Sequence, residues 1–305
     1  MQNQTNTKKL FALTVMTAIA AIFFSFMGAP FLRVLSSAKR LVFWGLGLAL
    51  VAGLLIAKAP LAALSIGSIW VTLGIYTECE RRGVEWKKNI LFSILAGFAF
   101  VMLMGGLVFK NLSNPIAQTA LQEITGPLLE ALQKLFPDNN FVIEMFYPYL
   151  PSMVFTSLMI GLATGLAFEA QIFKIFNLRR ERIASGLRWL DFRLPDLFIW
   201  MAMFGFLFTA VDVGFELVRI IATNVSIVAV VAFFIQGITV YEFTSRLLRF
   251  GMLSKTLMYV MIFLWLAPAF VVIGLADYWL DIRTKLTLKT TGPSKTPPSA
   301  PTNTK

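Results

Sequence analysis

Long apolar blocks recur along the chain, separated by short connections that hold most of its charged residues. Blocks of about 20 residues match the hydrocarbon thickness of a bilayer, and a backbone in lipid satisfies its own hydrogen bonds when it is helical. The pattern predicts an all-α, polytopic transmembrane bundle of about eight spans, within a range of seven to nine. The predicted spans are Leu10–Ala29, Leu41–Ala57, Leu61–Tyr76, Ile90–Phe109, Tyr149–Ile172, Leu197–Val213, Ile220–Val240 and Leu257–Ala276.

Two connections near the N-terminus predict local structure. Only Lys58, Ala59 and Pro60 separate the second and third spans, which favours a tight helical hairpin. The apolar stretch Pro30–Leu35 follows the first span closely, and a half-span that re-enters the membrane is one interpretation of it.

Residues 1–289 are predicted to form one transmembrane domain. Its segment 110–148 repeats apolar residues at helical spacing, which predicts an amphipathic helix outside the cytoplasm. Residues 290–305 are rich in Pro, Ser and Thr and are expected to be a disordered tail.

The composition agrees with a membrane protein and excludes several kinds of chemistry. Hydrophobic residues make up 57% of the chain and charged residues 14%, against about a quarter in soluble domains. Histidine is absent and Cys79 is the single cysteine, which excludes disulfides, thiolate zinc sites and Cys-His nucleophiles. We expect no metal, no cofactor and no enzymatic activity.

The basic residues predict the orientation and the partners. Alternate internal connections hold 16 Lys and Arg on one side of the membrane and four on the other, so the first set is predicted to be cytoplasmic. Eight spans then place both termini outside, whereas Lys8 and Lys9 favour an inside N-terminus; the half-span would resolve this conflict. The excess of basic residues gives a net charge of +11, and we expect these residues to contact anionic lipid rather than nucleic acid.

Small residues recur at intervals of four on three spans, and such stripes let membrane helices approach closely. We therefore predict that each stripe packs against another helix. The first comprises Thr17, Ala21, Ser25 and Ala29, the second Gly45, Ala49, Gly53 and Ala57, and the third Ser157, Gly161 and Gly165.

Polar groups within or beside the late spans are the candidate ligand contacts. Glu169 continues the third stripe and is predicted to point into the bundle, unless it reaches water or pairs with Lys174 or Arg179. Asp212 and Glu216 lie four residues apart and are candidates for a cationic solute or ion, although such a cluster is more often a solvated turn. Asn224 and Gln236 lie inside the seventh span, as ligand contacts or as hydrogen bonds between helices.

The stretch GLADYWLDIR leaves the last span with two aspartates, Asp277 and Asp281. It shares part of the CDP-alcohol phosphotransferase signature, but the other half of that signature is absent, so a metal-dependent lipid-phosphate enzyme is the weakest interpretation. An interfacial helix end with Tyr278 and Trp279 is the simplest one.

The same stretch is similar to the C-terminal signature of the YybS-like family of predicted bacterial membrane proteins, a domain of unknown function. Its positions here are Gly274, Asp277, Trp279, Asp281 and Arg283. Other segments agree in order along the chain: KAPLAALSIGSIWVTLGIYTECERRG, RLPDLFIW and NVSIVAVVAFFIQG. Ser37-Ala38 departs from the His-Gly that is common in relatives.

The resemblance implies distant similarity to the S components of energy-coupling-factor transporters and to membrane proteins of the cell-shape machinery. By analogy, the stripe that begins at Thr17 would contact an ATPase coupling module. The leading prediction is a bacterial inner-membrane protein with an S-component-like bundle that binds or transports a small solute. The alternative is a membrane scaffold whose basic connector, residues 171–196, contacts lipid or a partner protein.

Overall fold

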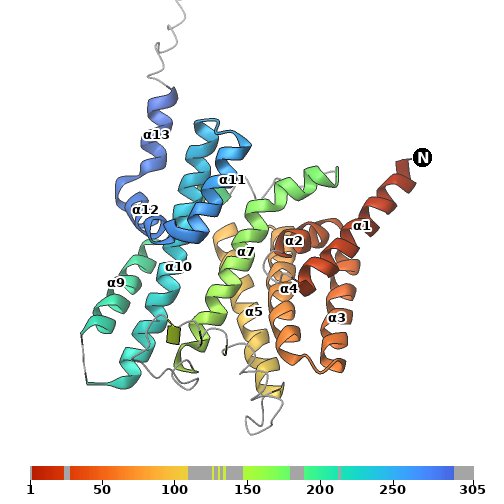
Figure 1. Ribbon diagram of the computed structural model, residues 1–305, viewed down its shortest axis with the longest axis horizontal. Coiled ribbons are helices and arrows are strands. Elements are labelled where there is room, and N and C mark those ends of the chain that lie inside the picture. The colour runs from red at the N-terminus through yellow and green to blue at the C-terminus, as the bar shows by residue number, and fades with distance from the viewer. Residues whose placement is uncertain are drawn as a thin grey trace, which may run out of the picture. The chain divides into compact units, whose positions relative to one another are not determined.

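The computed structural model describes residues 2–23, 28–108, 126, 130, 133–134, 147–178, 189–211 and 214–291, and these residues are helical or form connecting turns, with no strand among them. The long predicted segment 110–148 therefore lies almost entirely outside the described residues, as does the tail from residue 292. Figure 1 shows the helices. Their bounds are α1 Gln2–Phe23, α2 Ala29–Ala38, α3 Arg40–Ile56, α4 Pro60–Arg81, α5 Trp86–Val108, α7 Leu150–Ile175, α9 Asp196–Ala210, α10 Glu216–Leu247, α11 Met252–Met261, α12 Ala267–Leu280 and α13 Ile282–Thr291.

Each predicted span overlaps an apolar helix of the described chain. Four helical segments are long and apolar enough to cross a membrane: Pro60–Arg81, Trp86–Leu107, Tyr147–Ile175 and Glu216–Leu247. Four more are apolar but shorter: Phe11–Ala21, Arg40–Ile56, Phe198–Ala210 and Ala267–Leu280. The all-helical membrane class is confirmed, and the number of eight spans stays a prediction.

The N-terminal region differs from one continuous span. α1 ends at Phe23, and α2 is a separate helix of ten residues with Pro30 in its first turn. Proline is well placed there, because the first helical N–H groups need no partner inside the helix. The stretch predicted as a half-span is thus an independent short helix, and seven of its residues are buried.

The last predicted span, Leu257–Ala276, is interrupted. α11 ends at Met261, a π-helical turn follows from Ile262 to Leu266, and α12 begins at Ala267. Pro268 explains the break, since it lacks an N–H and its ring collides with the carbonyl one turn earlier. The predicted hairpin between α3 and α4 is confirmed, with Lys58 in a left-handed conformation at the turn (φ 58°).

The chain divides into two compact units, and α10 contributes to both. Unit 1 comprises Met1–Trp189 and Asp196–Val231, and unit 2 comprises Leu190–Pro195 and Ala232–Lys305. The prediction of a single domain over residues 1–289 stays a prediction.

α4 is the central helix of unit 1. It packs against α1, α2, α3, α5 and α7, and α2 also contacts α1, α3 and α7 (Figure 1). Two thirds of its most apolar window is buried, against 17% for α5. A helix apolar on all sides and surrounded by neighbours is the expected core of a membrane bundle.

The small-residue stripes have different outcomes. In the third stripe, Gly161 and Gly165 are buried and a Cβ at Gly165 would lie 3.0 Å from Leu73, so this stripe packs as predicted. In the first, Thr17, Ala21 and Ala29 are buried within the chain, so they leave no exposed face for a coupling module; Ser25 lies outside the described residues.

The second stripe does not pack against another described helix, because α3 is rotated by about half a turn relative to the prediction. Gly45, Ala49, Gly53 and Ala57 are all exposed. The close approach instead occurs at Gly47, where a Cβ would lie 2.6 Å from ring atoms of Trp70, and Trp70 donates a hydrogen bond to the Phe43 carbonyl.

Unit 2 is built around a close crossing of α10 and α12. A Cβ at Gly237 would collide with the backbone of Phe270, and a Cβ at Gly274 would collide with the Phe233 carbonyl. Glycine at both positions lets the two backbones touch, as in other membrane helix pairs. Gly274 of the C-terminal stretch is thus a packing residue.

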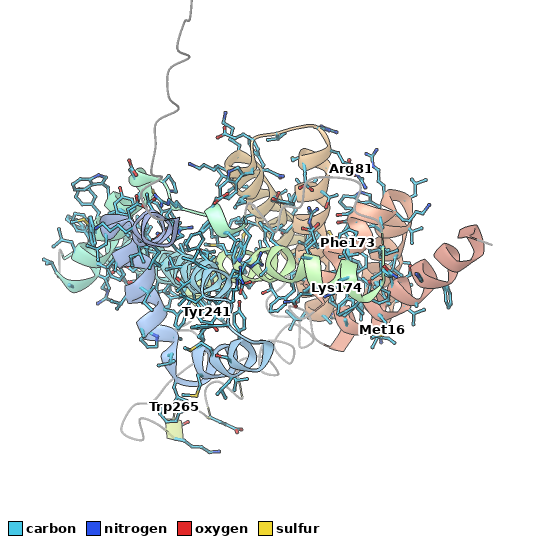
Figure 2. All side chains as sticks on the ribbon, turned by 90° about the horizontal axis from the view of Figure 1, so that it is seen from above. Met16, Arg81, Phe173, Lys174, Tyr241 and Trp265 are labelled. Carbon is cyan, nitrogen blue, oxygen red and sulfur yellow. The ribbon has the colours of Figure 1, made fainter. Side chains whose placement is uncertain are left out.

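Large apolar side chains are exposed on the outer surfaces of the helices. Figure 2 shows this for Met16 and for Trp265, which is 79% exposed. In water such surfaces would mark a binding or aggregation site. Together with the long apolar helices, they indicate contact with lipid.

Substitution of Gly47 by alanine tests the α3–α4 packing. A methyl group there overlaps the Trp70 ring, and overpacking typically costs about 1–3 kcal/mol. The matched control is Gly45→Ala, two residues away, where nothing lies within 4 Å of the added methyl group. Alanine reduces the conformational entropy of the unfolded chain, which should raise the free energy of unfolding by up to about 1 kcal/mol. Thermal unfolding in lipid nanodiscs should show a lower Tm for G47A alone. Equal Tm values for the two variants would show that α3 is oriented differently.

Candidate functional site

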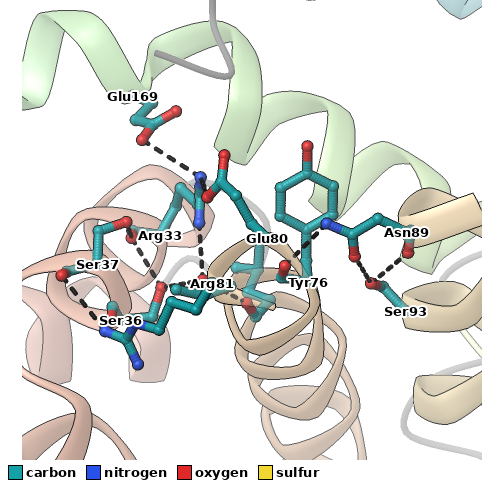
Figure 3. Close-up of polar contacts among 11 residues, drawn as sticks. Arg33, Ser36, Ser37, Tyr76, Glu80, Arg81, Asn89, Ser93 and Glu169 are labelled. Atoms are coloured by element: carbon teal, nitrogen blue, oxygen red, sulfur yellow. Dashed lines mark hydrogen bonds and ion pairs between the residues drawn. The ribbon is translucent and has the colours of Figure 1, made fainter. Parts of the chain in front are cut away.

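The most buried charged side chain described in unit 1 is Arg33, which is 1% exposed. It projects from the middle of α2, between α4 and α7 (Figure 3). A charge inside an apolar bundle costs at least about 2.5 kcal/mol and requires compensating partners. Arg33 therefore defines the candidate site.

Arg33 binds carboxylates from two different helices. Its Nη2 lies 2.5 Å from Glu80 Oε2 on α4 and 3.5 Å from Glu169 Oε1 on α7. Its Nη1 donates a hydrogen bond of 2.7 Å to Thr77 Oγ1, and the guanidinium carbon lies 5.0 Å from the centre of the Tyr76 ring. The site therefore combines ionic, hydrogen-bonding and cation–π contacts.

The two carboxylates differ in their access to solvent. The side chain of Glu169 is 4% exposed, whereas that of Glu80 is 24% exposed. Glu80 lies in the last turn of α4, so its partly exposed carboxylate lies between Arg33 and the surface at the helix end.

A second layer of polar contacts surrounds the helix end. Arg81 Nη2 donates to the Ser36 carbonyl at 2.7 Å, and Glu78 accepts from both Arg81 and Arg40. Ser36 Oγ lies 2.7 Å from Thr77 Oγ1. These contacts tie the end of α2 and the start of α3 to the end of α4.

Tyr76 is positioned by α5. Asn89 Nδ2 donates 2.9 Å to the Tyr76 carbonyl, and Ser93 Oγ lies 3.1 Å from Asn89 Oδ1 (Figure 3). This bond ties the Asn89 side chain of α5 to the α4 backbone at Tyr76. The Tyr76 ring is thereby held beside Arg33.

The structure places Glu169 inside the bundle, as its position on the third stripe predicts. Its ionic partner is Arg33, whereas Lys174 is exposed and Arg179 lies outside the described residues. Arg33 falls in the connection after the first predicted span, and neither the small-residue stripes nor the polar residues of the late spans single it out. The signal for it is a single cation within the apolar run Pro30–Leu35, where it needs a counter-ion.

Asn224 connects α10 to the start of α7. Its Oδ1 accepts from the Ser152 N–H at 3.1 Å, and its Nδ2 donates to the Pro148 and Ile220 carbonyls at 2.8 and 2.9 Å. Ser152 belongs to the first turn of α7, whose N–H groups have no partner within the helix. Asn224 thus forms a structural hydrogen bond between α10 and α7.

The remaining acidic candidates do not form a described cluster. Glu216 is exposed at the start of α10, and Asp212 lies outside the described residues.

In unit 2, Gln236 is fully buried and joins three segments. Its Oε1 accepts from the Leu194 N–H at 3.1 Å, while its Nε2 donates 3.0 Å to the Gly274 carbonyl and lies 3.4 Å from Asp277 Oδ2. Like the Asn224 amide, the Gln236 amide forms its described hydrogen bonds with other residues of the same chain.

Asp277 and Arg283 form the buried pair of the C-terminal stretch. Arg283 Nη2 and Nε donate to Asp277 Oδ2 at 2.7 and 3.1 Å, and both side chains are at most 5% exposed. Arg283 also donates to the Leu190 and Phe192 carbonyls at 2.6 and 3.0 Å. The pair therefore holds the end of the basic connector against α12 and α13.

Asp281 has a different role from Asp277. It ends α12 in a left-handed conformation (φ 47°, ψ 52°), and its half-exposed carboxylate pairs with Arg193. Hydrogen bonds from Thr284 and Arg193 hold the pKa of Asp281 below its usual value. The two aspartates bind different arginines, and Trp279 is exposed beside them.

The fold and these clusters define a helical membrane protein, in which Arg33 and Arg283 are the buried arginines among the described residues. The chain belongs to the family described as Predicted membrane protein (DUF2232), whose sequence profile matches residues 8–278. No curated protein and no solved structure matches the chain.

Removing the Arg33 guanidinium should destabilise unit 1. Arg33→Met leaves Glu169 buried without this counter-ion, and breaking a buried pair typically costs about 3–5 kcal/mol. Lys88→Met is the control, because Lys88 and Glu85 are both more than half exposed and such pairs contribute at most about 1 kcal/mol. Chemical unfolding in nanodiscs measures both. A small effect of R33M would show that Arg33 is not enclosed as described.

Replacing Arg283 should release the connector. Arg283→Lys keeps the charge but cannot donate to Asp277 and two carbonyls together, so the Leu194 amide should exchange its hydrogen about tenfold faster, corresponding to one lost charge-assisted bond. Arg193→Lys is the control, since both side chains of its pair with Asp281 are nearly half exposed. Hydrogen exchange with mass spectrometry of peptide 190–195 reports the difference. Unchanged exchange in R283K would contradict the assigned role.

Proposed function

We propose that this protein is a non-enzymatic protein of the bacterial cytoplasmic membrane that binds or transports a small solute, with the Arg33 cluster as its binding site. One observation carries the proposal. A fully buried arginine lies on a ten-residue helix, too short to cross the membrane, between carboxylates of two helices that are long enough to do so.

Two general features of membrane proteins support this assignment. Ionisable residues among transmembrane helices are rare, and they typically mark solute or ion pathways. Transporters also place their sites at short or interrupted helices with Gly or Pro at the break. Gly28, Ala29 and Pro30 at the start of α2 match that pattern.

The proposal moves the site away from Asn224 and Gln236. Both amides bind backbone groups through oxygen and nitrogen, which favours a structural role. Arg33 differs from these amides because one of its partners, the Glu80 carboxylate, is a partly exposed side chain.

The scaffold alternative receives less support from the described residues. Its basic connector ends at Leu190–Pro195, and this end is bound by Arg283 and Gln236 of the same chain. An S-component-like bundle and an ATPase coupling module stay proposals. If such a module binds, its surface must differ from the stripe at Thr17, which is buried.

A thermal-shift screen in nanodiscs tests the proposal, using small anionic, cationic and zwitterionic metabolites. A solute at 100 times its Kd should stabilise the wild type by about 2.7 kcal/mol. The gain should be lost in Arg33→Lys, which keeps the charge but not the planar fork, and kept in Lys88→Arg. A solute that stabilises the wild type and R33K equally would place the site elsewhere, and the absence of any stabilising solute would refute the proposed function.

A further inference from the structure

We propose that the Arg33 site takes a solute bearing a carboxylate, which binds by replacing the side chain of Glu80. This inference rests on the proposed function and specifies the chemical class of the solute. It follows from the unequal way in which the partners of Arg33 are held.

Most partners of Arg33 are fixed. Thr77 is buried and donates in turn to the Leu73 carbonyl, and the backbone beside Tyr76 is held by Asn89. Glu169 is enclosed within the bundle. None of these groups can leave the guanidinium without repacking of α4 or α7.

Glu80 is the exception. It makes the shortest contact to Arg33, at 2.5 Å, yet a quarter of its side chain is exposed. It lies in the last turn of α4, before the left-handed Gly83. Rotation of this side chain alone would move its carboxylate toward the surface and leave one edge of the guanidinium available.

The vacated position is suited to a carboxylate. Arg33 Nη2 donates to one oxygen of the Glu80 carboxylate, which shows that a carboxylate fits at this position and forms a charge-assisted hydrogen bond there. Exchange of one carboxylate for another leaves the charge of the buried site unchanged, so it adds no uncompensated charge. Arg33 and Glu169 remain paired throughout.

The charges around the helix ends favour an anion over a cation. Lys39, Arg40 and Arg82 are exposed and Arg81 is partly exposed, and Glu78 is the acidic residue that pairs with two of them. Such a basic rim raises the local concentration of anions. A cationic solute would instead have to approach Arg33, which is enclosed and cannot turn away.

Chemical rescue tests the inference directly. Glu80→Ala removes the tethered carboxylate, and the probes are sodium formate and sodium acetate, with sodium chloride at equal ionic strength and methylammonium chloride as a cation. We expect acetate to raise the Tm of E80A by several degrees relative to chloride, about the effect of saturating a site. Methylammonium should have no effect.

Two comparisons separate rescue from general salt effects. Glu85→Ala removes an exposed glutamate of the same α4–α5 turn region and should show no acetate-specific shift. The wild type should bind acetate more weakly than E80A, because the tethered side chain competes at an effective concentration in the millimolar range. In E80A/R33K the acetate effect should disappear.

A second variant covers the case in which E80A does not fold. Glu80→Gln keeps the shape but is a weaker partner for Arg33, so acetate should still bind it more tightly than it binds the wild type. Acetate acting no differently from chloride on E80A and E80Q would overturn the inference, as would stabilisation by methylammonium. If the metabolite screen then still finds an Arg33-dependent solute without a carboxylate, the proposed function stands and only this inference fails.

Discussion

A guanidinium enclosed by apolar helices must have an acceptor for its charge, and this requirement determines how α2, α4 and α7 meet. α2 is too short to be held by lipid contacts along its length, so its register depends on the neighbours of Arg33. Thr77 and Glu80 lie three residues apart on α4 and present both acceptors on one face, while Glu169 closes the site from α7. The close helix contacts at Gly165 bring that last carboxylate within reach.

Unit 2 solves the same problem with different acceptors, and the contrast is informative. Arg283 is as enclosed as Arg33, but it binds Asp277 and two backbone carbonyls, all within the buried end of α12 and the connector. Backbone carbonyls cannot exchange with a solute unless the chain unfolds locally. Arg33 instead has one partner that is a mobile side chain near the surface. The Arg283 site is therefore closed to a solute, whereas the Arg33 site has one exchangeable position.

Hydrophobic length was sufficient to predict the helices, because lipid leaves few alternatives for a polar backbone. Small-residue spacing was sufficient to predict that Glu169 points inward. The same spacing failed for Gly45 and Gly53, since it shows that residues share a face but not which face meets a neighbour. Gly47, two residues away from Gly45, makes the contact with the Trp70 ring.

Arg33 was missed because a cation beside a short apolar run resembles an ordinary cytoplasmic flank. Pro268 indicates the break in the last span, but a mean hydropathy over the whole span does not detect a single proline.

The fate of Asn224 and Gln236 shows how ligand contacts differ from structural hydrogen bonds in a membrane protein. A polar side chain within an apolar helix needs a partner, and the sequence does not show whether that partner is a helix or a solute. The distinction depends on how its polar groups are occupied. Asn224 accepts from the Ser152 N–H at the start of α7, and Gln236 accepts from the Leu194 N–H in the connector, so removing either amide would leave a buried backbone N–H without this acceptor. The Glu80 carboxylate satisfies a side chain that any carboxylate would satisfy equally, and it alone among the carboxylates on Arg33 reaches solvent. The Arg33 cluster is a stronger candidate for the binding site than Asn224 or Gln236 because a solute carboxylate can replace its Glu80 partner. Polarity and burial alone do not distinguish these residues.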